Sequence, residues 1–308
     1  MTALRRSARL LPLTILLAAA ACVGERTPEP RSFDGGAALG YAAAQVGFGP
    51  RIPGTAGHAA QARWLDSLLS ARADTLVTQH WTHVDVRGDS LELSNFIARF
   101  NPAAAKRLLF LAHWDTRPRS DGTHVEPGDS AKPVPGANDG ASGVAVLLGV
   151  ADALKAAAPG VGVDLLFVDG EDYGDFFTER NDVLIGSRYY GAHQVAPQPL
   201  YAVLFDMVGD KDLRISQEGN SMIGAGEVVD LVWDTARKLG YGAVFVPYDN
   251  VTLTDDHVEL QQAGIRAIDV VDFDYPYWHT PHDTMDKISA QSLGIVGRLA
   301  LALVAREE

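Results

Sequence analysis

The chain has 308 residues, of which 47% are hydrophobic and only one, Cys22, is a cysteine. Its formal net charge of −13 argues against nucleic acid and against an anionic membrane surface as electrostatic partners. A single cysteine leaves no internal disulfide, so the hydrophobic core must hold the fold together.

The first 21 residues have the features of an export signal. Three arginines precede an apolar run that is shorter than the roughly 20 residues of a membrane-spanning helix. Cys22 follows three alanines and resembles a bacterial lipoprotein processing site, although leucine is more usual than alanine at position 19. We therefore expect a signal peptide over 1–21, a lipidated cysteine and polar tether over 22–33, and one folded domain over 34–308. The protein would be exported and anchored in the bacterial cell envelope at Cys22, with plain secretion as the alternative.

Beyond the tether, helical and strand-like apolar spacing alternate along the chain. Helices are expected over 56–72, 141–157, 225–239, 256–263 and 289–305. Strands are expected over 75–87, 92–100, 108–112, 163–168, 201–205, 243–246 and 266–271, the first two as a hairpin-like pair. Continuous apolar runs such as 108–112 are typical of strands buried on both faces. The pattern predicts a single-domain α/β fold, with a mixed, mostly parallel twisted sheet and helices on both faces.

Acidic and imidazole side chains follow the expected strands. They are His113 and Asp115 after 108–112, Asp139 after the loop 116–138, Glu171 and Asp172 after 163–168, Asp206 after 201–205, and His279 after 266–271. In such sheets ligands bind beyond the carboxyl ends of the strands. Zinc takes neutral imidazole nitrogen and carboxylate oxygen as ligands. Any one of these residues alone could be a solvated loop residue or a helix N-cap, but together they predict a metal site.

The order and spacing of these residues resemble the zinc aminopeptidase family M28 and, within that superfamily, the glutaminyl cyclases. The resemblance runs from GPRIPGTAGH (residues 49–58) to HTPHDTMDKI (residues 279–288). It implies a zinc-aminopeptidase-like catalytic domain over 34–308. The individual motifs are short, and their ordered set is what makes the resemblance specific.

The resemblance implies roles for the acidic pair and its neighbours. Asp139, Asp172 and His279 would be zinc ligands, and Glu171 would be the general acid/base. The family has Glu-Glu where this chain has Glu171-Asp172, so the second ligand has a shorter arm.

Two further residues have roles that depend on the branch of the superfamily. In a two-zinc aminopeptidase, His113 and Asp206 would complete a second zinc site. In a one-zinc cyclase, Asp206 and Asp255 would instead form a hydrogen-bonded carboxylate cluster around Glu171.

Two features favour the cyclase. The segment 173–185 separates the acidic pair from Gly186-Ser187-Arg188, and its length resembles that of the cyclase loop, with Phe177 where that loop carries an aromatic wall. Trp278 directly precedes His279, as in the cyclases, where the indole lines the pocket for the N-terminal glutamine. Both aromatic side chains could instead simply pack in the interior.

The sequence leaves three functions open. We favour a zinc-dependent glutaminyl cyclase, which needs one zinc, over a two-zinc aminopeptidase. A non-catalytic envelope protein that binds peptides is the third, and the complete ligand set argues against it. In the first two, the partner is the N-terminus of a peptide or protein. We expect a monomer whose only membrane attachment is the N-terminal lipid. Asp256 is expected to cap the helix over 256–263, and His257 to have a structural or capping role there.

Overall fold

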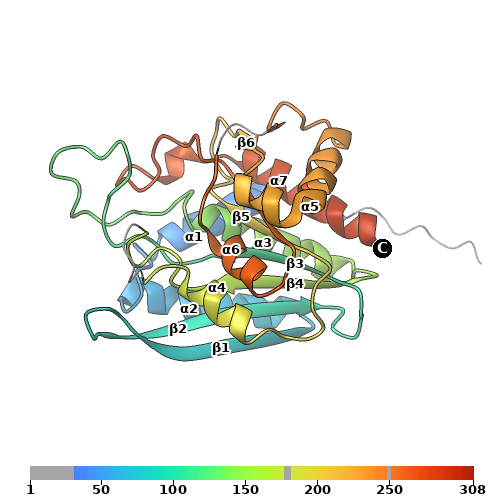
Figure 1. Cartoon of the computed structure of the whole chain (residues 1–308), viewed down its shortest axis with the longest axis horizontal. Coiled ribbons are helices and arrows are strands. Elements are labelled where there is room, and N and C mark those ends of the chain that lie inside the picture. Colours follow the sequence, from blue (N-terminus) through green and yellow to red (C-terminus); the bar gives the residue numbers. More distant parts are fainter. Residues whose placement is uncertain (1–30, 177–181, 248–250) are drawn as a thin grey trace, which may run out of the picture. The chain divides into compact units, whose positions relative to one another are not determined.

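A six-stranded sheet lies at the centre of the fold (Figure 1). The structure is a computed structural model that describes residues 31–176, 182–247 and 251–308. The strand order is β1-β2-β4-β3-β5-β8. Their bounds are β1 Thr75–Val84, β2 Ser90–Phe100, β3 Arg107–His113, β4 Gly162–Val168, β5 Ala202–Asp206 and β8 Ala267–Val271. The pairs β4–β3, β3–β5 and β5–β8 are parallel, and β1–β2 and β2–β4 are antiparallel. The sheet is therefore mixed and mostly parallel, as predicted.

Helices cover both faces of this sheet. On one face, α2 Ala56–Arg72, α3 Ala141–Ala156 and α5 Gly219–Lys238 pack against the strands, and α1 Gly35–Val46 and α7 Ala290–Glu307 pack against α3. The other face packs against α4 Ile185–Ala192 and α6 Asp256–Gln262. Alternate residues of one strand point to opposite faces. In β3, for example, Leu108 and Phe110 belong to the first core, and Leu109 and Leu111 to the second. The continuous apolar run of β3 thus arises from burial on both faces.

Most predicted elements are confirmed, and the differences have local causes. The expected strand over 243–246 is reduced to β7 Phe245–Val246, which pairs with β6 Ile215–Ser216 in a separate two-stranded sheet. The helix expected from 225 begins at Gly219, because two helical stretches join across a kink at Ala225. Helix α1 was not predicted, although Asp34 caps it by accepting bonds from Gly36 N and Ala37 N.

Helix α4 was also not predicted, because its eight residues IGSRYYGA are too few to establish a helical period. Within the described residues, none of the helices combines the length and apolarity required to cross a membrane.

Candidate active site

The carboxyl ends of the parallel strands bring the chemically active side chains to one edge of the sheet. His113 ends β3, Asp206 ends β5, and Glu171 and Asp172 follow β4. Asp139 lies just before α3, at a turn through Gly140 that takes a φ of +96°. Parallel neighbours end at the same edge, so four strand-end side chains meet although they are up to 93 residues apart.

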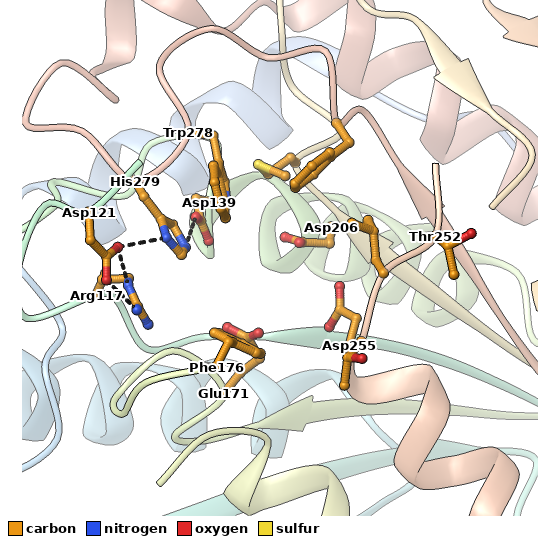
Figure 2. Close-up of a pocket in the computed structure, with 14 residues that line it drawn as sticks. Arg117, Asp121, Asp139, Glu171, Phe176, Asp206, Thr252, Asp255, Trp278 and His279 are labelled. Atoms are coloured by element: carbon orange, nitrogen blue, oxygen red, sulfur yellow. Dashed lines mark hydrogen bonds and ion pairs between the residues drawn. The ribbon is translucent and has the colours of Figure 1, made fainter. Parts of the chain in front are cut away.

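Asp139, Asp172 and His279 form the first group of side chains that could hold a metal ion. His279 Nε2 lies 3.2 Å from Asp172 Oδ1 and 3.5 Å from Asp139 Oδ2. All three side chains are buried. Figure 2 shows the His279 ring between the carboxylates of Asp121 and Asp139.

His113, Asp139 and Asp206 form a second such group, which shares Asp139 with the first. His113 Nε2 lies 3.1 Å from Asp139 Oδ1 and 3.2 Å from Asp206 Oδ1. The structure therefore brings together every residue that the sequence indicated for either one zinc or two.

The donor set fits zinc. It consists of imidazole nitrogens and carboxylate oxygens, which are zinc's usual nitrogen and oxygen ligands. Asp172 Oδ2 and His113 Nδ1 are buried and have no hydrogen-bond partner among the described residues. A buried carboxylate oxygen without a partner is costly, and a cation beside it would remove that cost.

Glu171 lies beside these groups in an acidic environment. Burial and the charge of Asp172 raise the pKa of Glu171 well above its ordinary value, and the charge of Asp255 raises it further. Burial, with the charge of Asp206, raises the pKa of Asp255 to about 6. Figure 2 shows Asp206 and Asp255 facing the same cavity as Glu171. Asp206 also contacts the ring of His113, through Nε2. The other ring nitrogen of His113, Nδ1, lies 3.6 Å from Glu171 Oε2.

Two further carboxylates hold the backbone of the site: Asp115, which the sequence placed at the end of a strand without giving it a role, and Asp283, which was not predicted. Asp115 accepts hydrogen bonds from the backbone amides of Glu171 and Asp172, at 3.0 and 3.1 Å. Asp283 accepts from the amide of Asp139 at 3.0 Å and from the hydroxyl of Tyr275 at 2.7 Å. Each thus fixes the position of a metal-binding or acid/base residue through the main chain.

A cavity of about 470 Å³ opens onto the site. Its apolar lining residues are Phe176, Met207, Leu253, Phe273 and Trp278, of which Phe273 and Trp278 are in ring contact and form an aromatic wall. The other lining residues are polar: Arg117, Asp121, Asp139, Glu171, Asp206, Thr252, Thr254, Asp255 and His279. The cavity can therefore receive an uncharged chain against its aromatic wall and polar groups against the carboxylates.

The two predicted aromatic wall residues have different outcomes. The Trp278 ring stacks on the His279 ring, with centroids 4.0 Å apart and planes 22° apart, and also contacts Phe273. It lines the cavity rather than lying in the core. Phe177 lies outside the described residues, and its neighbour Phe176 lines the cavity.

The prediction for Asp256 is wrong. Asp255, not Asp256, is the N-cap of α6, and its side chain accepts from Asp256 N at 2.5 Å. His257 is fully buried, with Nε2 3.1 Å from Glu218 Oε2, so it belongs to the interior rather than to the metal groups. The sequence alone could not distinguish adjacent aspartates as caps, because either could begin the same helix.

Comparison with known proteins matches the model of peptidase family M28 to residues 95–304. Two crystal structures from Bacteroides thetaiotaomicron are both 35% identical to this chain. One is a leucine aminopeptidase precursor, with a TM-score of 0.86 over 91% of this chain and 99% of that one. The other is a glutaminyl cyclase bound to N-acetylhistamine, with a TM-score of 0.85 over 90% and 99%.

Curated relatives include the same two activities. The glutaminyl-peptide cyclotransferase-like protein of Mus musculus is 25% identical over 83% of this chain and 71% of its own length. Aminopeptidase YwaD of Bacillus subtilis is 28% identical over 57% of this chain, and the match spans only 38% of that protein.

Proposed function

Because the chain belongs to peptidase family M28, we propose that its site is that of a zinc-dependent glutaminyl cyclase. Such an enzyme converts the N-terminal glutamine of a peptide to pyroglutamate and releases ammonia. The proposal is supported by the similarity to a glutaminyl cyclase over 90% of this chain. It is carried by one observation, the aromatic wall in which Trp278 stacks directly on His279.

Asp139, Asp172 and His279 would hold the zinc ion, which supplies Lewis-acid polarisation of the γ-amide carbonyl of the substrate. Trp278 and Phe273 would enclose the methylene groups of the glutamine side chain. This places the carbonyl carbon of the γ-amide near the α-amine of the same residue, so the two reacting atoms are held in the orientation that ring closure needs.

Glu171 is the general acid/base. The α-nitrogen forms a bond to the γ-amide carbon, Glu171 accepts the proton that the amine loses, the bond from that carbon to the amide nitrogen breaks, and the proton leaves with the departing ammonia. The raised pKa of Glu171 suits both directions of transfer. No water takes part in the bond exchange, which is consistent with an apolar wall beside the reacting atoms.

A two-zinc aminopeptidase is the second candidate. It is favoured by the group of His113, Asp139 and Asp206, whose ligand atoms all lie within 4.8 Å of one another. In that case Asp139 would bridge two ions and Glu171 would activate a water molecule.

A substrate comparison separates the two candidates. Purified residues 23–308 are incubated with zinc and either a peptide that begins with glutamine or one that begins with leucine. The products are identified by mass spectrometry. The cyclase predicts loss of ammonia from the first and no change in the second. Release of free leucine would establish the aminopeptidase and overturn the proposal.

Export and anchoring are a separate proposal, supported by the basic and apolar residues before Cys22. The mature chain would begin at Cys22 and carry a lipid on its thiol, and it would act as a monomer on peptide N-termini. The mass of the N-terminal fragment from a bacterial host distinguishes a lipidated cysteine from a plain cleavage product or an unprocessed chain.

A further inference from the structure

The segment 117–122 passes beside the first metal-binding group, and the proposed reaction does not use it. Its Arg117 is only 1% exposed. Arg117 Nη1 donates to Asp172 Oδ1 and to the Asp172 backbone carbonyl, both at 3.1 Å. The other edge of the guanidinium binds Asp121 through Nε at 2.8 Å and Nη2 at 2.5 Å. One buried cation therefore joins a metal-binding carboxylate to a second carboxylate.

The same segment also holds His279. Asp121 Oδ1 lies 3.0 Å from His279 Nδ1, on the side of the ring opposite the Nε2 atom that faces Asp139 and Asp172. Gly122 N donates to the His279 carbonyl at 3.1 Å. A Cβ atom at Gly122 would lie 2.1 Å from the Trp278 carbonyl, so only glycine permits this approach. His279 itself has a φ of +53°, which is uncommon for a residue other than glycine.

These contacts form a continuous chain of interactions, which Figure 2 shows from Arg117 through Asp121 to His279. It starts at one proposed zinc ligand, Asp172, and ends at another, His279. Asp172 has a shorter arm than a glutamate, and Arg117 fixes both its side chain and its backbone.

From this geometry we propose that Arg117 and Asp121 are positioning residues that set the zinc affinity of the site. Arg117 holds the carboxylate of Asp172 in the orientation for binding, and Asp121 fixes the ring orientation of His279 and the nitrogen that carries its proton. Partners of this kind, behind metal ligands, typically change metal affinity 10- to 100-fold. The proposal rests on zinc binding by Asp139, Asp172 and His279, and not on which reaction the enzyme performs.

The alternative is that this ion pair only stabilises the fold. A buried guanidinium with two carboxylate partners, 5.6 Å from the Phe176 ring, would be costly to remove in either case. The two roles differ in their effect on zinc. A purely structural pair changes the melting temperature of the zinc-free protein and leaves the zinc dissociation constant of the folded protein unchanged.

The test measures the zinc dissociation constant by competition with a chromophoric chelator, and the melting temperature of the zinc-free protein. Arg117→Gln is expected to weaken zinc binding about 10- to 100-fold. Arg117→Lys should weaken it less, because lysine keeps the charge but not the forked geometry. The matched control is Arg188→Gln, in α4. Arg188 is 51% exposed and pairs with Glu259 at 3.1 Å, away from Asp121 and the metal groups, so its replacement should leave the dissociation constant unchanged.

A dissociation constant for Arg117→Gln within twofold of the wild type would overturn the proposal. If Arg117→Gln does not fold, Asp121→Asn decides, because asparagine keeps an acceptor for His279 and loses the charge that Arg117 binds. We expect about tenfold weaker zinc binding for Asp121→Asn, and an unchanged value would overturn the proposal. Wild-type protein that binds no zinc would instead overturn the metal site itself, so the two failures are distinguishable.

Discussion

In the proposed cyclase, Glu171 is the base that serves both the attacking and the leaving group. Its side chain is buried, faces the cavity, and has its amide fixed by Asp115. It does not belong to either of the two groups at the site that could hold a metal ion. Its proposed role in proton transfer can therefore be separated experimentally from the proposed zinc binding.

Replacing Glu171 with glutamine keeps the size of the side chain and removes the base. We expect kcat to fall by about 10²- to 10⁴-fold, the usual contribution of a general acid/base, with zinc content unchanged. Ammonia release and elemental analysis of the same preparation measure the two effects. Full activity in Glu171→Gln would show that another group moves the proton.

At the residue scale, the sequence identified side chains that follow strands, together with Asp139 and His279 in loops, and missed Arg117 and Asp121 within a long loop. His113, Glu171 and Asp206 stand at the ends of apolar runs, where the fold class itself predicts a site. Arg117 and Asp121 lie in the loop 116–138, which has no hydrophobic period. The contact of Asp121 with His279 joins residues 158 positions apart, and no local pattern encodes such a distance.

At the scale of elements, the position of Asp139 depends on how closely α3 approaches β5. A Cβ atom at Gly143 would lie 2.0 Å from the Phe205 carbonyl and 2.9 Å from Ala112 Cβ. Glycine therefore lets α3 pack against the ends of β3 and β5, which carry His113 and Asp206.

Gly143→Ala should destabilise the protein by about 1–3 kcal/mol, the usual cost of an added methyl group in a packed core. Gly40→Ala is the matched control, because a Cβ atom at this exposed position of α1 would meet, among the described residues, no atom within 4 Å beyond its two neighbours and the backbone of its own helix. It should stabilise by about 0.5–1 kcal/mol. Urea unfolding measures both, and equal effects of the two substitutions would contradict this account of α3.

Glu218 connects α5 to the loop that carries Leu253 of the cavity wall. It caps α5 by accepting from Asn220 N and Ser221 N, and it also accepts from Leu253 N at 2.9 Å. Burial by itself would raise its pKa, but the contact with His257 and these amides lower the pKa to about 2. The carboxylate is therefore stabilised by folding.

This shift gives a pH dependence with a definite sign. The pKa of Glu218 in the folded protein lies below its ordinary value near 4.5. The contribution of its carboxylate to the free energy of unfolding is therefore complete above pH 4.5 and is lost as the pH falls toward 2. Glu218→Gln should lower the free energy of unfolding by roughly 1–3 kcal/mol at pH 6, and by clearly less at pH 3. The test compares urea unfolding of both proteins at the two pH values. A difference that stays constant or grows at pH 3 would contradict the assignment.

The elements themselves were predicted best where the apolar period was long or the run continuous. Helix α2 has the predicted bounds. Strand β3 is one residue longer than predicted at each end, and β4 begins one residue earlier than predicted. Helix α1 was missed because its sequence GGAALGYAAAQV has three glycines and few large apolar residues. Its helical state depends on the Asp34 cap and on packing against α3 and α7, which are tertiary effects.

At the scale of the whole molecule, the fold concentrates buried carboxylates at one edge of the sheet. Burial, and in addition the charge of Asp172, raises the pKa of Asp139 to about 6. Zinc bound only by the folded protein stabilises it by mass action.

Removal of zinc should therefore lower the melting temperature. With free zinc at 100 times its dissociation constant the stabilisation is about 2.7 kcal/mol, which corresponds to roughly 5 °C or more for a domain of this size. Thermal unfolding with zinc and with a chelator measures the difference. Coincident unfolding curves would show that the buried carboxylates do not hold zinc.

The most direct test of the one-zinc cyclase is a titration of zinc into the zinc-free protein while pyroglutamate formation is followed. We predict that turnover of a peptide beginning with glutamine rises linearly and becomes constant at one zinc per chain, and that no leucine is released from a leucine peptide at any zinc concentration. Turnover that needs two zinc ions per chain, accompanied by leucine release, would contradict the one-zinc cyclase and assign His113 and Asp206 to a second zinc.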